Sequence, residues 1–158
     1  MSLNLDGLTE LSDAAAESLS KHKGGLLEFA GLTELSDAAA ESLSKNKTPH
    51  LEFKCLTELS DAAAESLSKH EGTLTLAGLT ELSDAAAESL SKHKKWPLGL
   101  EGLTELSDAA AESLSKHEGD LELRGLTKLS DAAAKSLSKH EGNINYRDPK
   151  KWANSLRQ

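Results

Sequence analysis

Two hydrophobic patterns alternate along the chain. Short stretches in which apolar and polar residues alternate are typical of β-strands with one buried face. In chain order they are LNL, LEF, a second LEF, LTL, LGL, LEL and INY. Each of the first six is followed by a segment such as LSDAAAESLSKH, whose apolar residues have helical spacing. The pattern predicts one short strand and one helix in each unit.

The units are internal repeats. The sequence LTELSDAAAESLSK occurs unchanged five times, and a sixth copy differs only at Lys128 and Lys135. Successive copies start 23 or 24 residues apart, and a period of this size indicates a solenoid, in which each unit depends on its neighbours for stability. We expect six strand–helix repeats and a seventh strand in residues 1–147. Residues 148–158 are expected to form a capping helix, whose Trp152 and Leu156 cover the last repeat.

Each predicted helix has recognisable ends. Ser12 or Asp13, and the equivalent residues of the other repeats, are suitable N-caps because their side-chain oxygens can accept hydrogen bonds from free backbone N–H groups. In most units glycine follows the last turn, where we expect a left-handed residue to end the helix. These glycines are Gly24, Gly72, Gly119 and Gly142. Glu17 and Lys21 are four residues apart and are expected to pair on the exposed face.

The expected fold class is α/β, with a parallel sheet on one side and short helices on the other. Parallel strands lie about 4.8 Å apart, whereas helices need roughly 8 to 10 Å between their axes, so the stack should bend. The strands would then line a concave side and the helices a convex side. No N-terminal cap matches the C-terminal one, so we expect the first strand edge to self-associate, or the chain to be a fragment of a longer array.

The repeat unit, LxLxxLxxLSDAAAESLSKHxG, resembles the leucine-rich repeat, and most closely its bacterial and ribonuclease-inhibitor-like forms with a convex α-helix. The resemblance covers residues 3 to about 147. One departure is that leucine, as at Leu8 and Leu32, stands where the family usually has an asparagine after the strand. The resemblance implies a solenoid without enzymatic activity or cofactor that binds a protein or peptide on its concave sheet. The near identity of the copies fits a recently duplicated natural array, and equally a consensus or designed repeat protein with no ligand.

Composition and charge narrow the range of partners. The chain has 26 acidic and 18 basic side chains, and its net charge of −8 disfavours nucleic acid and anionic membrane surfaces. Aromatic residues make up 3% of the 158 residues, so the core must be built from leucine and alanine. There is no apolar run long enough to span a membrane and no signal-peptide pattern, so we expect a soluble protein. The single cysteine, Cys55, excludes an internal disulfide.

The residues that differ between repeats are concentrated in the strand segments and the loops beside them. If the strand leucines point inward, the alternate residues face the concave side. The candidate binding residues are Glu28, His50, Glu52, Lys54, Thr73, Thr75, Trp96, Glu101, Glu122 and Arg124. They form either a recognition surface or a set of exposed positions that tolerate any residue. The sheet face covers on the order of 300 Å², less than the roughly 800 Å² of a standard partner surface, so a protein partner would also use the loops.

Histidine, serine, aspartate and cysteine could each take part in catalysis or metal binding, but their positions in the repeat favour structural roles. Histidine recurs at one helix-end position, and we interpret these residues as bonded to loop backbone, since neighbouring helix ends are too far apart to share a zinc ion. They are His22, His70, His93, His117 and His140. Serine, histidine and aspartate occur in nearly every unit, but a catalytic triad is defined by geometry, and we expect no enzymatic activity. Cys55 replaces a glycine found in five other units and is interpreted as a tolerated substitution.

Overall fold

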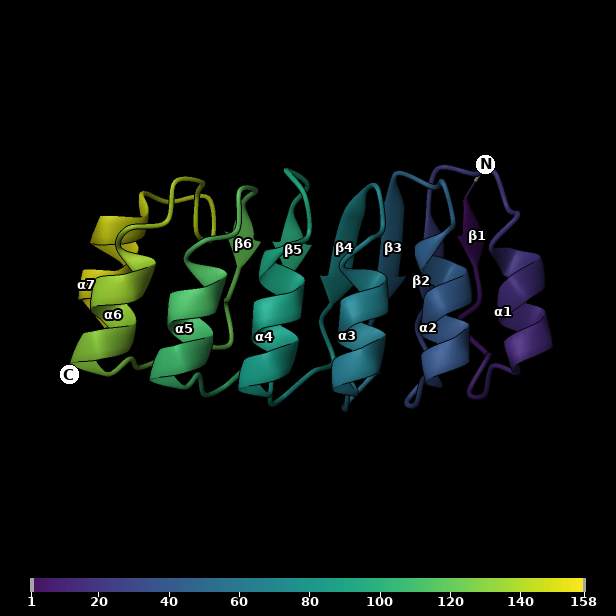
Figure 1. Ribbon diagram of the computed structural model, residues 1–158, viewed down its shortest axis with the longest axis horizontal. Helices are drawn as coiled ribbons and strands as arrows, with labels where there is room; N and C mark the ends of the chain where they lie inside the picture. Colours follow the sequence, from purple (N-terminus) through teal and green to yellow (C-terminus); the bar gives the residue numbers. More distant parts are fainter. Residues whose placement is uncertain (1, 158) are drawn as a thin grey trace.

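The computed structural model of the chain describes residues 2–157 and has two layers, a row of helices and a sheet beside it (Figure 1). The sheet has six parallel strands in chain order, and a helix joins each strand to the next. The strands are β1 (Leu3–Asn4), β2 (Leu27–Phe29), β3 (His50–Phe53), β4 (Thr73–Leu76), β5 (Leu98–Gly99) and β6 (Leu121–Glu122). The predicted α/β class, with alternating strands and helices and a parallel sheet, is confirmed.

Short helices of seven or eight residues form the second layer. They are α1 (Asp13–Leu19), α2 (Asp37–Ser44), α3 (Asp61–Leu67), α4 (Asp84–Ser91), α5 (Asp108–Leu114), α6 (Asp131–Leu137) and α7 (Pro149–Leu156). Serine is the N-cap of each repeat: the Ser12 side chain accepts a hydrogen bond from the N–H of Ala15 at 3.2 Å. Asp13 is the first helical residue, where the helix dipole favours a negative charge. Helices this short are marginal alone, so packing must stabilise them.

Leucine and alanine fill the space between the layers. In β3, Leu51 and Phe53 are fully buried and the intervening Glu52 is partly exposed, as the strand alternation predicts. Phe29 and Phe53 are paired in adjacent strands, and their rings stack with 5.1 Å between centres. The small side chain of Ala40, which is fully buried, lets helix α2 lie close to the sheet.

A ladder of serine–aspartate hydrogen bonds joins the N-terminal ends of neighbouring helices. The Ser36 hydroxyl donates to Oδ1 of Asp13 at 2.5 Å, and the same serine oxygen accepts a hydrogen bond from the N–H of Ala39 at 3.0 Å. The equivalent donors and acceptors are Ser60 and Asp37, Ser83 and Asp61, Ser107 and Asp84, and Ser130 and Asp108. Asp131, the last aspartate of the series, instead accepts a hydrogen bond from Nε of Arg157. In α2 to α6, the serine that caps the helix is therefore held by the preceding repeat.

The left-handed glycines predicted after the helices do not form. Within residues 2–157, no glycine has a positive φ angle. At Gly72, Gly119 and Gly142 the backbone lies too close to the preceding repeat for a side chain: a Cβ at Gly72 would lie 2.7 Å from the carbonyl oxygen of Pro49 and 2.9 Å from Nε2 of His70. The prediction is wrong about the cause, since packing between repeats excludes a side chain there and backbone handedness does not.

The seventh strand predicted at INY is reduced to a single bridge. Ile144 pairs with Leu121 of β6, but it also forms an antiparallel bridge with Arg147, because the chain turns back on itself. Asn145 and Tyr146 make this turn with φ angles of 51° and 61°. Two consecutive left-handed residues cannot continue an extended strand, so the sheet ends at β6.

The two ends of the stack differ. At the C-terminal end, α7 packs on α6, Trp152 is 5% exposed, and the N–H of Leu129 donates to the carbonyl oxygen of Leu156 at 2.9 Å. At the N-terminal end, β1 is the edge strand of the sheet. Four leucines of the first repeat are only partly buried, whereas the equivalent residues of the inner repeats are fully buried. They are Leu3, Leu5, Leu8 and Leu19.

Candidate functional site

The candidate site is the open sheet face, the side of the sheet that the helices do not cover. Its central row consists of Glu28, Glu52, Thr75, Gly99 and Glu122, which are paired in register from β2 to β6. This row contains four of the ten predicted binding residues. The register follows from the repeat, because equivalent residues of successive repeats occupy adjacent strands.

Five more predicted residues lie at the two ends of the strands. His50 and Thr73 are paired at the start of β3 and β4. Lys54, Glu101 and Arg124 come two residues after the central row, on the same side of the chain according to the strand alternation. The structure therefore brings nine of the predicted residues onto or beside this face.

The tenth predicted residue, Trp96, lies at the edge of the site. It belongs to the loop between α4 and β5, and it is 46% exposed. Its carbonyl oxygen is 3.1 Å from Nε2 of His117, so the loop backbone is held by the next repeat. Trp96 therefore combines an anchored backbone with a half-exposed side chain.

Two of the predicted binding residues are buried and paired within the chain. Glu28 and Glu122 are each 8% exposed. Lys54 Nζ donates to Oε1 of Glu28, and this hydrogen bond raises the pKa of Lys54. Arg124 Nε donates to Oε2 of Glu122 at 3.1 Å. The surface that these pairs present to solvent is therefore mainly that of the exposed lysine and arginine side chains.

Glu101 differs from these paired carboxylates. Its Oε2 atom is buried and has no hydrogen-bond partner among the described residues. Burial raises the pKa of its carboxyl group, and the nearby Glu122 carboxylate adds to the shift. The carboxylate lies over Gly99, where a Cβ would be 2.9 Å from Oε2 and 3.1 Å from Oε1 of Glu101. Gly99 therefore leaves room for an acidic group that no cation of residues 2–157 neutralises by a direct ion pair.

Sequence reasoning missed Tyr146. Its side chain is 74% exposed, and the guanidinium carbon of Arg124 lies 5.4 Å from the centre of its ring. The hydrogen bond between the phenol and Glu122 raises the pKa of Tyr146. An aromatic residue with a positive φ angle is uncommon, and such conformations are concentrated at functional sites. The signal could not be found in the sequence, where INY matches the strand pattern of the other repeats.

A row of buried histidines runs between the helices and the sheet. Four of them, His70, His93, His117 and His140, are at most 5% exposed. The rings of His93 and His117 are nearly parallel with 6.0 Å between centres, and those of His117 and His140 with 6.3 Å. His93 Nε2 is 2.9 Å from the carbonyl oxygen of Gly72. The predicted contact with loop backbone is confirmed for these three stacked histidines.

The buried imidazoles favour their neutral form. Burial, together with the charge that His93 would carry, lowers the pKa of His70 to about 4 and that of His117 to about 4. Burial also lowers the pKa values of His93 and His140. Neutral rings stacked 6 Å apart cannot converge on one metal ion, since zinc needs each nitrogen at about 2 Å.

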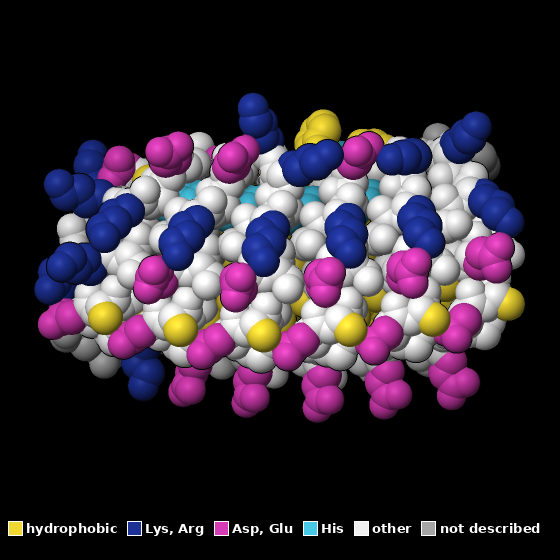
Figure 2. Space-filling view, in the orientation of Figure 1, with side chains coloured by type: hydrophobic (Ala, Val, Ile, Leu, Met, Phe, Trp, Pro, Cys, Tyr) yellow, Lys and Arg dark blue, Asp and Glu magenta, His cyan; other side chains and the backbone are white. Residues whose placement is uncertain are grey.

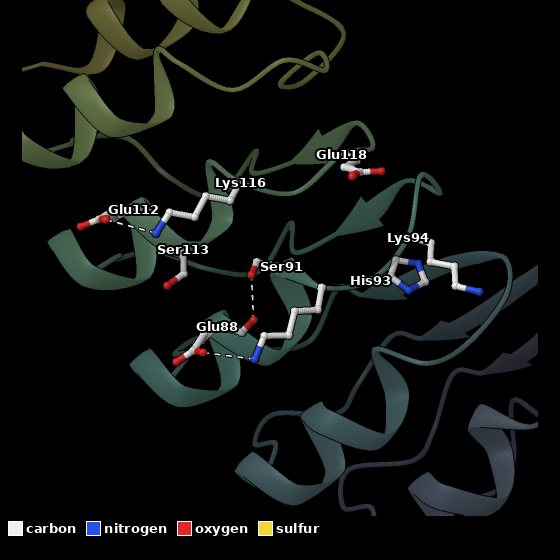
Figure 3. A pocket seen from close by; sticks show the side chains of 9 residues that line it. Glu88, Ser91, His93, Lys94, Glu112, Ser113, Lys116 and Glu118 are labelled. Atoms are coloured by element: carbon white, nitrogen blue, oxygen red, sulfur yellow. Dashed lines mark hydrogen bonds and ion pairs between the residues drawn. The ribbon is translucent and has the colours of Figure 1, made fainter.

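The helix side carries charged side chains in regular rows (Figure 2). The predicted pair of Glu17 and Lys21 is present at 3.6 Å. Equivalent pairs join Lys45 to Glu41, Lys69 to Glu65, Lys92 to Glu88, and Lys116 to Glu112 at 2.9 to 3.3 Å. Figure 3 shows a groove between α4 and α5. In this groove Lys92 and Lys116 extend toward Glu88 and Glu112, the glutamates with which they pair. These paired charges leave the groove without an evident binding group.

In residues 2–157 there is no group of three or more histidine, cysteine, aspartate or glutamate side chains that could hold a metal ion. Cys55 is exposed and unbonded to another cysteine. None of the helices described has the length and apolar character needed to cross a membrane.

Comparison with known proteins finds no matching family model, no matching curated protein and no matching solved structure. The open sheet face and the chemistry of its side chains are therefore the features that bear on function.

Proposed function

We propose that the chain is a non-enzymatic recognition module of the leucine-rich-repeat kind, which binds a protein or peptide with its open sheet face. The observation that supports this proposal is the division of residues between the two sides of the molecule. The helix side repeats one sequence and satisfies its own polar groups through the Ser–Asp ladder and the Glu–Lys pairs. The sheet side differs from strand to strand, leaves one carboxylate oxygen of Glu101 without a hydrogen-bond partner among the described residues, and exposes 74% of the Tyr146 side chain.

The types of exposed residue also favour recognition. Trp96, Arg124 and Tyr146 belong to the three residue types that dominate binding energy at protein interfaces. Arg124 and Tyr146 lie against each other at one end of the open sheet face, and Trp96 lies in a loop beside it. A partner that contacts all three would cover loops as well as the sheet, as the size of a standard interface requires.

The alternative is an idealised, consensus or designed structural repeat protein with no ligand. The ion pairs of Glu28 with Lys54 and of Glu122 with Arg124 favour this alternative, because they pair variable residues with one another. The first pair joins neighbouring strands, and the second lies within one strand segment. In that case the open sheet face would stabilise the stack and bind nothing. The two proposals differ in the role of the exposed residues of this face that form no ion pair. In the first they bind a partner, and in the second they bind nothing.

Affinity capture with three immobilised proteins tests the proposal. The first is the wild type, and the second carries His50→Ala, Glu52→Ala, Thr75→Ala and Tyr146→Ala, which change exposed or half-exposed residues outside the ion pairs. The third is a matched control with Thr57→Ala, Glu58→Ala, Glu81→Ala and Glu105→Ala, whose side chains are exposed in the segments that lead into the helices.

We expect a partner to bind the wild type and the control and to be lost by the open-face variant. Circular dichroism spectra must show that all three proteins are folded. A partner lost equally by both variants, or retained by both, contradicts the proposal. Capture of nothing by the wild type supports the alternative of a scaffold without a ligand.

A further inference from the structure

The C-terminal part of the open sheet face contains a compact cluster that we call the Glu101 cluster: Glu101, Glu122, Arg124 and Tyr146, arranged around Gly99. Glu122 and Gly99 are paired in register on β6 and β5. Arg124 connects two members of the cluster, since it donates to Glu122 at 3.1 Å and lies 5.4 Å from the ring centre of Tyr146. Glu101 is the charged member of the cluster that forms no ion pair.

The charges of the cluster do not balance. Glu52, Glu101 and Glu122 are close enough for the two other carboxylates to disfavour ionisation of Glu101. Arg124 is the cation that acts on Glu101, but its direct ion pair is with Glu122. Lys54, the other cation near this part of the sheet, pairs with Glu28. One carboxylate oxygen of Glu101 is buried without a hydrogen-bond donor among residues 2–157. A half-buried carboxylate in this state gains more from an added cation than one in water does.

An aromatic ring lies within range of the Glu101 charge. Because Gly99 has no side chain, the Glu101 carboxylate lies over the backbone of β5. The Tyr146 ring is held at the end of the sheet by two left-handed residues, it is 74% exposed, and it is near enough for the Glu101 charge to act on its phenol. An exposed aromatic ring near a carboxylate without an ion pair suits an organic cation.

From this charge complementarity we propose that the Glu101 cluster binds a basic side chain, an arginine guanidinium in preference to a lysine ammonium, presented by an extended segment of the partner. The inference rests on the proposed function and specifies the chemistry of its ligand. Arginine is preferred because its planar group forms paired hydrogen bonds with a carboxylate and stacks on an aromatic ring. A metal ion fits less well, because no group of three metal-ligating side chains is present in the described part of the chain.

An NMR titration tests this inference with two probes, acetyl-Ala-Arg-Ala-amide and the same peptide with neutral citrulline in place of arginine. Citrulline has nearly the shape of arginine but lacks its charge. The proteins are the wild type, Glu101→Gln, Tyr146→Ala and the control Glu105→Gln, which changes an exposed glutamate in the segment that leads into α5. The amide spectra also show whether each variant is folded.

We expect the arginine peptide to shift the amide signals of Gly99, Glu101 and Tyr146. The citrulline peptide and the Glu101→Gln variant should each weaken binding about tenfold or more, as loss of one charge-assisted hydrogen bond predicts, and Tyr146→Ala should weaken it to a smaller extent. Glu105→Gln should bind as the wild type does. Equal shifts with citrulline, equal binding by Glu101→Gln, shifts confined to the helices, or no shift at all overturn the inference. If the affinity capture nevertheless finds a partner on the open sheet face, only the choice of a basic ligand fails.

Discussion

The hydroxyl of Ser36 donates a hydrogen bond to the carboxylate of Asp13 in the preceding repeat at 2.5 Å. Because the same bond recurs at each later interface between repeats, two residues of the repeated sequence connect all the helices of the array. The leucine-rich-repeat resemblance would place a ladder after the strand, and leucine occupies that position here. The Ser–Asp ladder supplies a polar connection between repeats on the opposite side of the stack.

The ladder predicts that Asp61→Ala destabilises the protein although Asp61 is exposed. The substitution removes the acceptor for Ser83 and an acidic residue from the first turn of α3, while Ser60 still caps that helix. We expect a loss of about 1 kcal/mol in the free energy of unfolding, measured by urea titration. Glu58→Ala, which removes an exposed carboxylate outside the ladder, should change it by less than about 0.5 kcal/mol. Equal effects of the two substitutions would show that the ladder contributes nothing.

The buried histidines predict that stability falls in mild acid. Their pKa is 6.5 in an unfolded chain, whereas the pKa of His70 and of His117 is about 4 in the folded protein. The unfolded chain therefore binds more protons than the folded one between these values, and stability is complete above pH 6.5 and lost as the pH falls toward 4. The loss should be on the order of 2 to 3 kcal/mol for each of these histidines.

His117→Asn should reduce this pH dependence. Asn46 occupies the equivalent position in the second repeat and donates to the carbonyl oxygen of Leu19 at 2.7 Å, so asparagine fits the site without a titrating group. We expect a smaller difference between urea midpoints at about pH 7.5 and about pH 5 than in the wild type. His50→Asn, at an exposed position, is the matched control and should leave the difference unchanged. An unchanged slope in His117→Asn would mean that other groups cause the acid sensitivity.

The two tryptophans should differ sharply in their effect on stability. Trp152 is 5% exposed in the capping helix α7, and Trp152→Ala should cost about 3 kcal/mol or more because it uncovers the core of the last repeat. Trp96 is 46% exposed, and Trp96→Ala should cost less than about 1 kcal/mol. Urea unfolding followed by circular dichroism measures both. A small effect of Trp152→Ala would contradict the capping role of α7.

The edge strand β1 predicts self-association of the chain as it stands. Its outer edge pairs with no other strand of the described sheet, and Leu3 and Leu5 are only partly buried. Light scattering after size exclusion should show a mass above the 16.8 kDa of one chain as the concentration rises. Leu3→Lys with Leu5→Lys should restore the single-chain mass, whereas Tyr146→Ser, at the other end of the sheet, should not. A single-chain mass for the wild type at high concentration would disprove the prediction.

The repeated part of the fold could be predicted from the sequence, because the fourteen repeated residues of each copy specify the helix and its start, and the alternating apolar residues between the copies specify the strand. The Ser–Asp ladder could not be predicted, although its spacing of 22 or 23 residues is visible in the repeat. The role of the serine as a helix N-cap already explained its presence, so nothing in the sequence indicated a second role. The glycines near the helix ends were misinterpreted for a related reason: their neighbours belong to the preceding repeat, and only the packed structure shows them.

The candidate site was predicted in outline and not in detail. The strand alternation placed the variable residues on the correct side, but it could not show that Glu28 and Glu122 are buried beneath their own lysine and arginine partners. It also assigned Tyr146 to a strand, because two consecutive left-handed residues other than glycine have no signature in the sequence. Tyr146, which the structure adds to the site, owes its position to the turn that ends the array.

The most direct test of recognition by the open sheet face is to pan a displayed peptide library against the wild type and count the peptides that survive competition. We predict that soluble wild type and the Thr57, Glu58, Glu81 and Glu105 control variant displace the enriched peptides, while the His50, Glu52, Thr75 and Tyr146 variant does not. Enrichment of peptides that all three proteins displace equally, or no enrichment above a bare surface, would contradict the account.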